Sequence, residues 1–178
     1  QSMIDLPWLA RVVIEPLDRK KHDRAAFSCG ETRIDNYIAK TAARHQDENV
    51  TRVRIARLPN EPAILGFYAL NSHAIDVSSL PPEACKRLPH YPTAPAVYLS
   101  MIAVRLDQQG KGLGQFLLAD ALKRIYAVSL EIGVRFVVLD ALSDDAARLY
   151  ARLGFVELTT APGRMILDTT VIGKASGG

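Results

Sequence analysis

The spacing of hydrophobic and polar positions changes several times along this 178-residue chain. Alternating or continuous apolar runs predict strands at residues 9–17, 51–58, 63–72, 97–104, 135–141, 155–158 and 165–171. Apolar positions three and four residues apart predict helices at about 31–44, 117–132 and 143–153. We expect Gly133 to end the long middle helix. The proline-rich stretch 76–95 predicts a loop with one short helix at 82–88.

The order of these elements predicts a mixed α/β fold with one central sheet. The turn at 59–62 joins two strands as a hairpin, so the sheet should begin antiparallel. The strand, helix and strand over residues 97–141 predict a right-handed parallel crossover. A chain of this length suits one core, so we expect a single domain over residues 1–173 and a disordered tail at 174–178.

Three glycines at alternate positions, Gly110, Gly112 and Gly114, separate a predicted strand from the long helix. Such glycines let backbone N–H groups approach an anion, and the helix N-terminus adds positive potential. A Walker loop is excluded, because Lys111 is followed by glycine and not by a hydroxyl residue. The register also differs from a Rossmann loop, although Asp140 ends a strand-like run. The loop alone suits a diphosphate site and a plain glycine-rich turn about equally.

Composition excludes several other classes of protein. No run is long and apolar enough to span a bilayer, and the N-terminus lacks a signal-peptide pattern, so we expect a cytoplasmic protein without a membrane partner. The two cysteines and four histidines are scattered, which predicts neither a disulfide scaffold nor a metal site.

The basic residues cluster, although the formal net charge is only +3. Each cluster alone suits a solvated surface, but together they weakly favour a polyanionic partner. The clusters contain Arg19, Lys20, Lys21, His22 and Arg24, then Arg44, Arg52, Arg54 and Arg57, and finally Lys123, Arg124, Arg135, Arg148 and Arg152.

Two motifs stand in order along the chain, namely Gln109-x-x-Gly112-x-Gly114 and the run 146–155 (AARLYARLGF). Together they resemble the GNAT acetyltransferase superfamily. Its acyl-CoA loop pattern is Gln/Arg-x-x-Gly-x-Gly/Ala, and its closing pattern is A-x-x-x-Y-x-x-x-G-F. Two motifs in the right order are far more specific than either alone. The resemblance implies a GNAT fold, whose mixed sheet is splayed beside the glycine loop and flanked by helices, with acetyl-CoA as cosubstrate and no metal.

The resemblance also implies roles for individual residues. Tyr150 would act as the catalytic acid that protonates the leaving sulfur, although an isolated tyrosine is more often a core aromatic. Backbone N–H groups of Met101 or Ile102, aimed by a bulge, would bind the developing oxyanion. Ser143 or Asp145 would contact the pantetheine arm, where the family often has an asparagine. The expected acetyl-CoA-binding residues are Met101, Ile102, Ala103, Val104, Gln109, Gly110, Lys111, Gly112, Leu113, Gly114, Ser143 and Asp145.

No carboxylate in the sequence is a strong candidate for the general base. Glu31, Asp35 and Asp107 each suit a cap or a surface charge better. A lysine amine with a pKa of ~10.4 must lose a proton before attack, whereas an α-amine near ~8 needs little help. The acceptor is therefore more easily an α-amine than a lysine side chain.

A further resemblance points to one branch of the superfamily. The runs 27–38 (FSCGETRIDNYI) and 66–70 (GFYAL) resemble F-x-C-G-x-x-x-L-D-x-[WY]-L and G-[FY]-Y-[AST]-L of GNAT toxins from bacterial toxin–antitoxin pairs. This resemblance implies acetylation of the α-amino group of aminoacyl-tRNA, a block of translation, a ribbon-helix-helix antitoxin and a homodimer. The alternatives are a GNAT enzyme acting on a small amine or a protein N-terminus, and an acyl-CoA-binding regulatory module without turnover.

Overall fold

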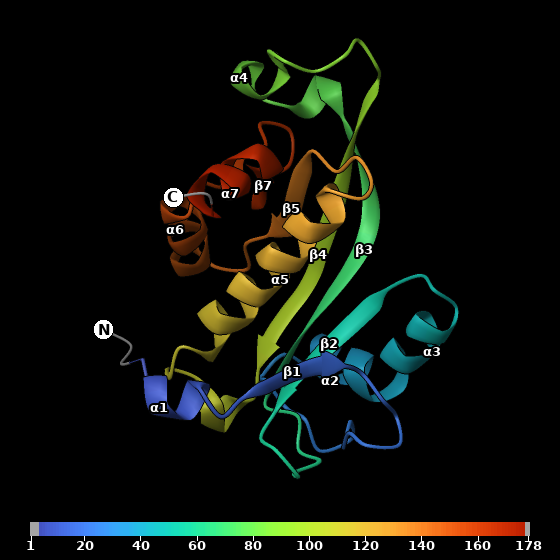
Figure 1. Ribbon diagram of the computed structural model, residues 1–178, viewed down its shortest axis with the longest axis vertical. Helices are drawn as coiled ribbons and strands as arrows, with labels where there is room; N and C mark the ends of the chain where they lie inside the picture. The colour runs from blue at the N-terminus through green and yellow to red at the C-terminus, as the bar shows by residue number, and fades with distance from the viewer. Residues whose placement is uncertain (1–3, 177–178) are drawn as a thin grey trace. The chain divides into compact units, whose positions relative to one another are not determined.

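The computed structural model describes residues 4–176, which divide into two compact units. The first unit contains the chain up to residue 71 and residues 101–121, and the second contains residues 72–100 and those from 122 onward. Strands β3 (Gly66–Asp76) and β4 (Thr93–Val104) and helix α5 (Leu113–Ser129) each continue from one unit into the other (Figure 1). The strands of the described residues form one seven-stranded sheet in the order β1-β2-β3-β4-β5-β7-β6.

The first unit contains the predicted antiparallel strands. β1 (Val13–Pro16) pairs antiparallel with β2 (Arg52–Arg57), and β2 pairs antiparallel with β3. The first part of the strand predicted at 9–17 is wrong, because helix α1 (Leu6–Leu9) precedes β1. The carboxylate of Asp5 accepts the N–H of Trp8 at 3.1 Å and so caps this helix. The proline of the helix lies in its first turn, where proline is tolerated.

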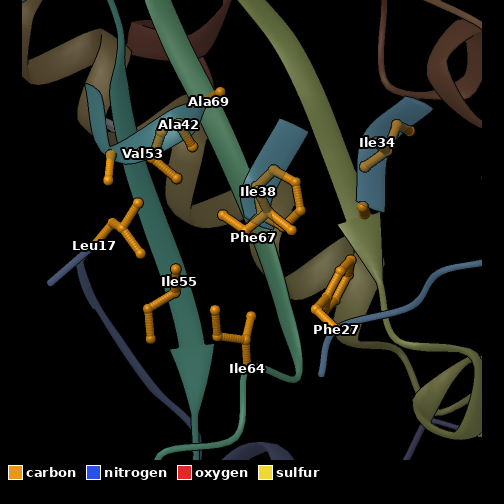
Figure 2. Close-up of a cluster of buried hydrophobic side chains, with 12 residues drawn as sticks. Leu17, Phe27, Ile34, Ile38, Ala42, Val53, Ile55, Ile64, Phe67 and Ala69 are labelled. Atoms are coloured by element: carbon orange, nitrogen blue, oxygen red, sulfur yellow. The ribbon is translucent and has the colours of Figure 1, made fainter. Parts of the chain in front are cut away.

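Two helices replace the single helix predicted at 31–44. α2 (Thr32–Lys40) and α3 (Ala42–Asp47) meet at Thr41, whose φ of −122° and ψ of −39° lie outside the helical region. The break allows Ile38 of α2 and Ala42 of α3 both to be fully buried, and α3 contacts β2 (Figure 1). Figure 2 shows the core of this unit, which consists of Leu17, Phe27, Ile34, Ile38, Ala42, Ala43, Val53, Ile55, Ile64, Phe67, Ala69 and Ala103.

A short 3-10 helix, η2 (Leu106–Gln108), and the glycine loop connect β4 to α5. The long helix ends at Ser129, so the prediction that Gly133 ends it is wrong. The Ser129 hydroxyl donates to the Tyr126 carbonyl at 2.5 Å, and the following residues form turns. No helix in the described part of the chain combines the length and hydropathy needed to cross a bilayer.

The second unit contains the predicted parallel pair of strands. β4 pairs in parallel with β5 (Phe136–Asp140) from Ala96 opposite Phe136 to Tyr98 opposite Val138. Both strands continue beyond this point but no longer pair with each other, which together with the antiparallel strands agrees with the expected mixed, splayed sheet. β7 (Arg164–Asp168) pairs antiparallel with β5 and with the short β6 (Val156–Glu157). The core contains Ile75, Leu80, Ala94, Ala96, Phe136, Val138, Leu158 and Ile166.

Helices in the second unit differ from the prediction near the end of the chain. β7 is followed by α7 (Thr169–Ser176), because the Asp168 carboxylate accepts the N–H of Thr170 at 2.9 Å and starts a helix. Residues 169–171 are therefore not strand, and 174–176 are helical instead of a disordered tail; 177–178 lie outside the described residues. The proline-rich stretch contains η1 (Val77–Ser79) and α4 (Pro82–Cys85), which is shorter than predicted, and α6 (Asp144–Arg152) confirms the last predicted helix.

Candidate functional site

The predicted acyl-CoA loop lies in the first unit, immediately before α5. Gly110 and Gly112 have φ values of +83° and +91°, which side-chain-bearing residues rarely adopt. Within the part of the chain that the structure describes, the N–H groups of Gly110, Lys111 and Gly112 have no hydrogen-bond partner. The first N–H groups of α5, beginning at Leu113 and Gly114, have none inside the helix. Such a row of N–H groups at a helix N-terminus fits the pyrophosphate of acetyl-CoA.

Two side chains of this loop hold its shape. The Gln109 amide donates to the carbonyl of Val104 at 3.0 Å and to that of Cys29 at 3.2 Å, which ties the loop to the end of β4 and to the turn before α2. The Lys111 ammonium lies 4.9 Å from the centre of the Trp8 ring, a cation–π contact. These side chains therefore brace the loop, and contact of Gln109 and Lys111 with acetyl-CoA stays a prediction.

The end of β4 supplies the other residues predicted to face the acetyl group. Ala103 is buried, whereas Met101, Ile102 and Val104 are half-buried. The Ala103 carbonyl passes so close to Gly66 that a Cβ placed on Gly66 would lie 2.8 Å from its oxygen. That the N–H groups of this segment bind the thioester oxygen stays a prediction.

The predicted acid, Tyr150, lies in α6 of the second unit. Its ring is 8% exposed and packs on Phe155, with 5.7 Å between ring centres. Gly154, with a φ of +103°, ends the helix so that the Phe155 N–H donates to the Tyr150 carbonyl at 3.1 Å. Burial raises the pKa of Tyr150, so the phenol stays protonated at neutral pH. Among the described residues its hydroxyl has no hydrogen-bond partner, which leaves the proton available for donation.

The two residues predicted to contact pantetheine already have partners within α6. The Ser143 Oγ accepts the Ala146 N–H at 3.1 Å and caps the helix, while its own proton stays available. The exposed Asp145 carboxylate pairs with Arg148 one turn later. Both assignments stay predictions.

The three carboxylates considered as general bases lie at turns and helix ends. The Asp35 carboxylate accepts the Cys29 N–H at 2.8 Å, which stabilises the turn before α2. The Arg105 guanidinium, 2.6 Å from Asp107, holds the pKa of that carboxyl below its usual range. Glu31 is exposed at the N-cap position immediately before α2, and its side chain makes no capping hydrogen bond. The described residues also contain no group of three or more His, Cys, Asp or Glu side chains suited to a metal ion.

A polar cluster that the sequence analysis missed lies where β4 and β5 part. The Tyr98 hydroxyl donates to Asp140, and Arg164 donates to Asp140 at 2.9 Å and to the Tyr98 hydroxyl at 3.3 Å. The His73 ring lies 5.4 Å from the Tyr98 ring. Burial raises the pKa of Tyr98 and lowers that of His73, and the charge of Arg164 lowers the latter further. The cluster therefore ties β4, β5 and β7 together, and its only sequence signal was the acid at the end of a strand.

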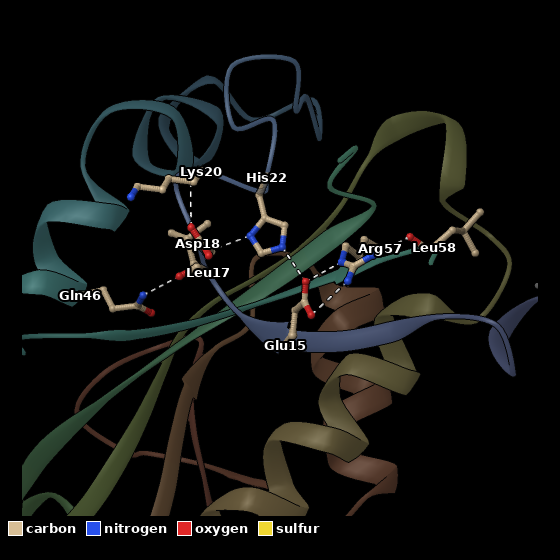
Figure 3. A network of polar contacts seen from close by, with 8 residues as sticks. All are labelled: Glu15, Leu17, Asp18, Lys20, His22, Gln46, Arg57 and Leu58. Carbon is tan, nitrogen blue, oxygen red and sulfur yellow. Dashed lines mark hydrogen bonds and ion pairs between the residues drawn. The ribbon is translucent and has the colours of Figure 1, made fainter. Parts of the chain in front are cut away.

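A second polar network links β1 and β2 in the first unit (Figure 3). The Nδ1 atom of His22 accepts the Asp18 N–H at 2.9 Å, so Nε2 carries the proton and donates to Glu15 at 2.8 Å. Arg57 donates to both oxygens of Glu15 at 2.5 and 3.2 Å, and these bonds lower the pKa of Glu15 to about 2. Since each group is engaged by the others, the network is structural.

Several of the clustered basic residues have acidic partners. Each of the three clusters contributes at least one such contact, which reduces the charge offered to a polyanion. The engaged residues include Arg19, His22, Arg57, Arg135 and Arg148.

Comparison with known proteins identifies the family. A family model described as acetyltransferase (GNAT) domain matches residues 63–157. The chain is 37% identical over 175 residues to the probable toxin TacT of Sinorhizobium fredii, covering 94% of this chain and 97% of that protein. It is 31% identical over 145 residues to the tRNA-acetylating toxin of Mycobacterium tuberculosis, covering 82% and 85%. A structure of AtaT complexed with acetyl-methionyl-tRNAfMet has a TM-score of 0.85 and 26% identity, covering 93% and 99%.

The sheet and the glycine loop before α5 therefore define an acyltransferase fold. The chain belongs to the GNAT acetyltransferase family. The matched segment contains both the loop and the Tyr150 motif. The two toxins, which the chain matches over most of their length, confirm the resemblance to the toxin branch.

Proposed function

We propose that this protein is an acetyl-CoA-dependent N-acetyltransferase that acts as the toxin of a toxin–antitoxin pair. It acetylates the α-amino group of aminoacyl-tRNA and thereby blocks translation. The observation that carries this proposal is the similarity to a tRNA-acetylating toxin at 31% identity over 82% of the chain. The fold shared with AtaT, which was solved with acetyl-methionyl-tRNAfMet, supports the same acceptor.

In this proposal the backbone of the first unit binds the donor. Acetyl-CoA supplies an acetyl group activated as a thioester. The N–H groups from Gly110 to Gly114 hold its pyrophosphate. The N–H groups of Met101 or Ile102 orient the acetyl carbonyl and polarise its oxygen, and Ala103 and Val104 complete the wall of the site.

Tyr150 supplies the proton that the departing thiol needs. As the C–S bond breaks and the C–N bond to the acceptor forms, the Tyr150 hydroxyl donates its proton to the sulfur, and the proton that the acceptor nitrogen loses restores the phenol. The raised pKa supports this role, since the phenol is fully protonated at pH 7. An acceptor α-amine with a pKa near ~8 is partly neutral already, so its attack needs little help from a general base.

The remaining assignments follow from the same family. Ser143 and Asp145 contact the pantetheine arm, and residues 1–173 act as one catalytic domain, since the family match extends over both units. The protein acts in the cytoplasm, forms a homodimer and is restrained by a ribbon-helix-helix antitoxin. The antitoxin is tested by the neighbouring reading frame, which should encode a small ribbon-helix-helix protein.

A direct assay tests the function. Purified protein is incubated with labelled acetyl-CoA and a charged tRNA pool at low salt, and label is followed on the α-amino group after hydrolysis of the ester. Label on the amino acid supports the proposal. Unmodified charged tRNA together with label on a small amine or a protein N-terminus would identify the alternative enzyme, and acetyl-CoA binding without any turnover would identify a regulatory module.

A further inference from the structure

A hollow of about 270 Å³ lies beside α2 in the first unit. It is lined by Arg33, Asn36, Tyr37, Lys40, Thr41 and Met101. The α2 residues in this set are three and four positions apart and so share one face of the helix, while Ile34 and Ile38 belong to the buried cluster (Figure 2). Met101 comes from the end of β4. The hollow therefore opens beside the strand that we propose to orient the acetyl group.

The lining carries two positive charges and no negative one. Arg33 and Lys40 are both exposed, and within the described part of the chain neither has an acidic partner. The one acid inside α2, Asp35, is held by the Cys29 N–H at 2.8 Å and by the Ser28 hydroxyl at 3.1 Å. Arg19, Arg57, Arg135 and Arg148 of the sequence clusters are paired with carboxylates, whereas here the positive potential is available to an anion.

The wall between these cations is fixed by packing. The Tyr37 hydroxyl lies 3.3 Å from Nδ1 of His45, and the two rings pack edge to face at 5.6 Å. Tyr37 and Met101 both pack on the buried cluster of the first unit. Burial raises the pKa of Tyr37, so this wall is uncharged at neutral pH. The hollow is thus a preformed neutral surface with a cation at each end.

Size limits what the hollow holds. Pockets for whole small-molecule ligands are roughly 300–1,000 Å³, so this one suits a single terminal group and not all of acetyl-CoA. Arg33 and Lys40 are seven residues apart, which places their backbones about 10 Å apart along the helix. Their long side chains span a sugar-phosphate unit between them, and Asn36 and Thr41 add polar groups for ribose or phosphate oxygens.

We propose that this hollow binds the acceptor end of aminoacyl-tRNA, with Arg33 and Lys40 contacting backbone phosphates. The esterified amino acid is thereby delivered next to the end of β4. The inference rests on the proposed function, and it adds the location of the acceptor and the residues that recognise its phosphates. Recognition of phosphate and not of bases lets this site accept the shared end of different tRNAs.

The test removes the charges of Arg33 and Lys40 and compares the effect with the removal of two positive charges elsewhere on the protein. The variant R33Q/K40Q is compared with K86Q/R87Q, which removes one lysine and one arginine from an exposed segment of the second unit. The charge-preserving variant R33K/K40R serves as the rescue. Rates of aminoacyl-tRNA acetylation are measured from low to moderate salt, and the dissociation constant of acetyl-CoA is measured for each protein.

We expect kcat/KM for aminoacyl-tRNA to fall roughly tenfold or more in R33Q/K40Q, since two charged hydrogen bonds are lost. The slope of log kcat/KM against log salt should become shallower by about 1.4, because each single-strand phosphate contact contributes ~0.7. Acetyl-CoA affinity should not change, and R33K/K40R and K86Q/R87Q should stay near the wild type. If R33Q/K40Q loses no more activity than K86Q/R87Q, the hollow is not the acceptor site; if the wild type itself leaves aminoacyl-tRNA unmodified, the proposed function is wrong.

Discussion

Replacement of Gly66 by alanine should disturb the link between the core and the acyl-CoA loop. A Cβ at this position would lie 2.8 Å from the Ala103 carbonyl oxygen and 2.9 Å from a methyl carbon of Leu117. The carbonyl belongs to β4 and cannot rotate away, and Leu117 is fully buried in α5. Either β3 moves or β4 and α5 separate, and Ala103 and the start of α5 border the proposed pyrophosphate site.

The magnitude follows from two opposing effects. Overpacking of a dense core costs about 1–3 kcal/mol. Gly66 has no positive φ, so alanine can adopt its backbone conformation and also stabilises the protein by roughly 0.4–1 kcal/mol through the unfolded chain. The net loss should be about 1–2 kcal/mol, and acetyl-CoA should bind more weakly because the displaced segments adjoin the loop.

Gly133→Ala is the matched control. A Cβ there meets nothing within 4 Å, and its φ is not positive, so this variant should be neutral or slightly more stable. Urea unfolding of both variants gives the free energies, and titration with acetyl-CoA gives the affinities. If Gly66→Ala proves as stable as Gly133→Ala and binds acetyl-CoA equally well, the close approach at Gly66 does not position the loop.

Three further changes test the chemistry and the electrostatics. Tyr150→Phe keeps the buried ring but removes the acid, so kcat should fall roughly 100-fold with acetyl-CoA affinity unchanged; an unchanged kcat would rule out proton donation. The pKa of Glu15 is lowered from 4.5 to about 2. Its contribution to the free energy of unfolding is therefore complete above pH 4.5 and is lost as the pH falls toward 2. Solvent screening limits this to about 1 kcal/mol, and Arg57→Gln should flatten that part of the stability–pH curve measured by urea unfolding. Asp107→Asn should leave the pH–rate profile unchanged, because Arg105 keeps this carboxyl ionised and weakly basic; loss of the acidic limb would instead make it the base.

Local sequence signals predicted those elements whose formation depends on neighbouring residues. The alternation in residues 51–58 and the apolar run 135–141 correspond to β2 and β5, and Ser143 caps α6 as its position before two aspartates indicates. Boundaries set by side-chain hydrogen bonds were harder to predict. The Asp5 carboxylate caps α1 at the start of one apolar run, and the Asp168 carboxylate caps α7 at the end of another. In each case one carboxylate oxygen accepts a helical N–H group that would otherwise lack a partner.

Long-range contacts explain the other differences. Thr41 interrupts a stretch whose helical spacing continues on both sides, because two helices can bury both Ile38 and Ala42 against the sheet. The cluster of Tyr98, Asp140 and Arg164 joins three strands, so no single segment of the chain contains its pattern.

The same distinction explains why the sequence pointed to the proposed donor site and did not point to the proposed acceptor site. Binding of pyrophosphate depends on backbone N–H groups, and the conformation that frees them is encoded by glycines at fixed spacing within six residues. Binding of an RNA end depends on side chains, and the hollow brings Arg33 and Lys40 together with Met101, more than sixty residues away. Several cations in the basic sequence clusters, among them Arg19, Arg57 and Arg135, have acidic partners in the folded protein. The unpaired cations beside α2 are separated by apolar core residues along the chain and become one charged surface only when the helix forms.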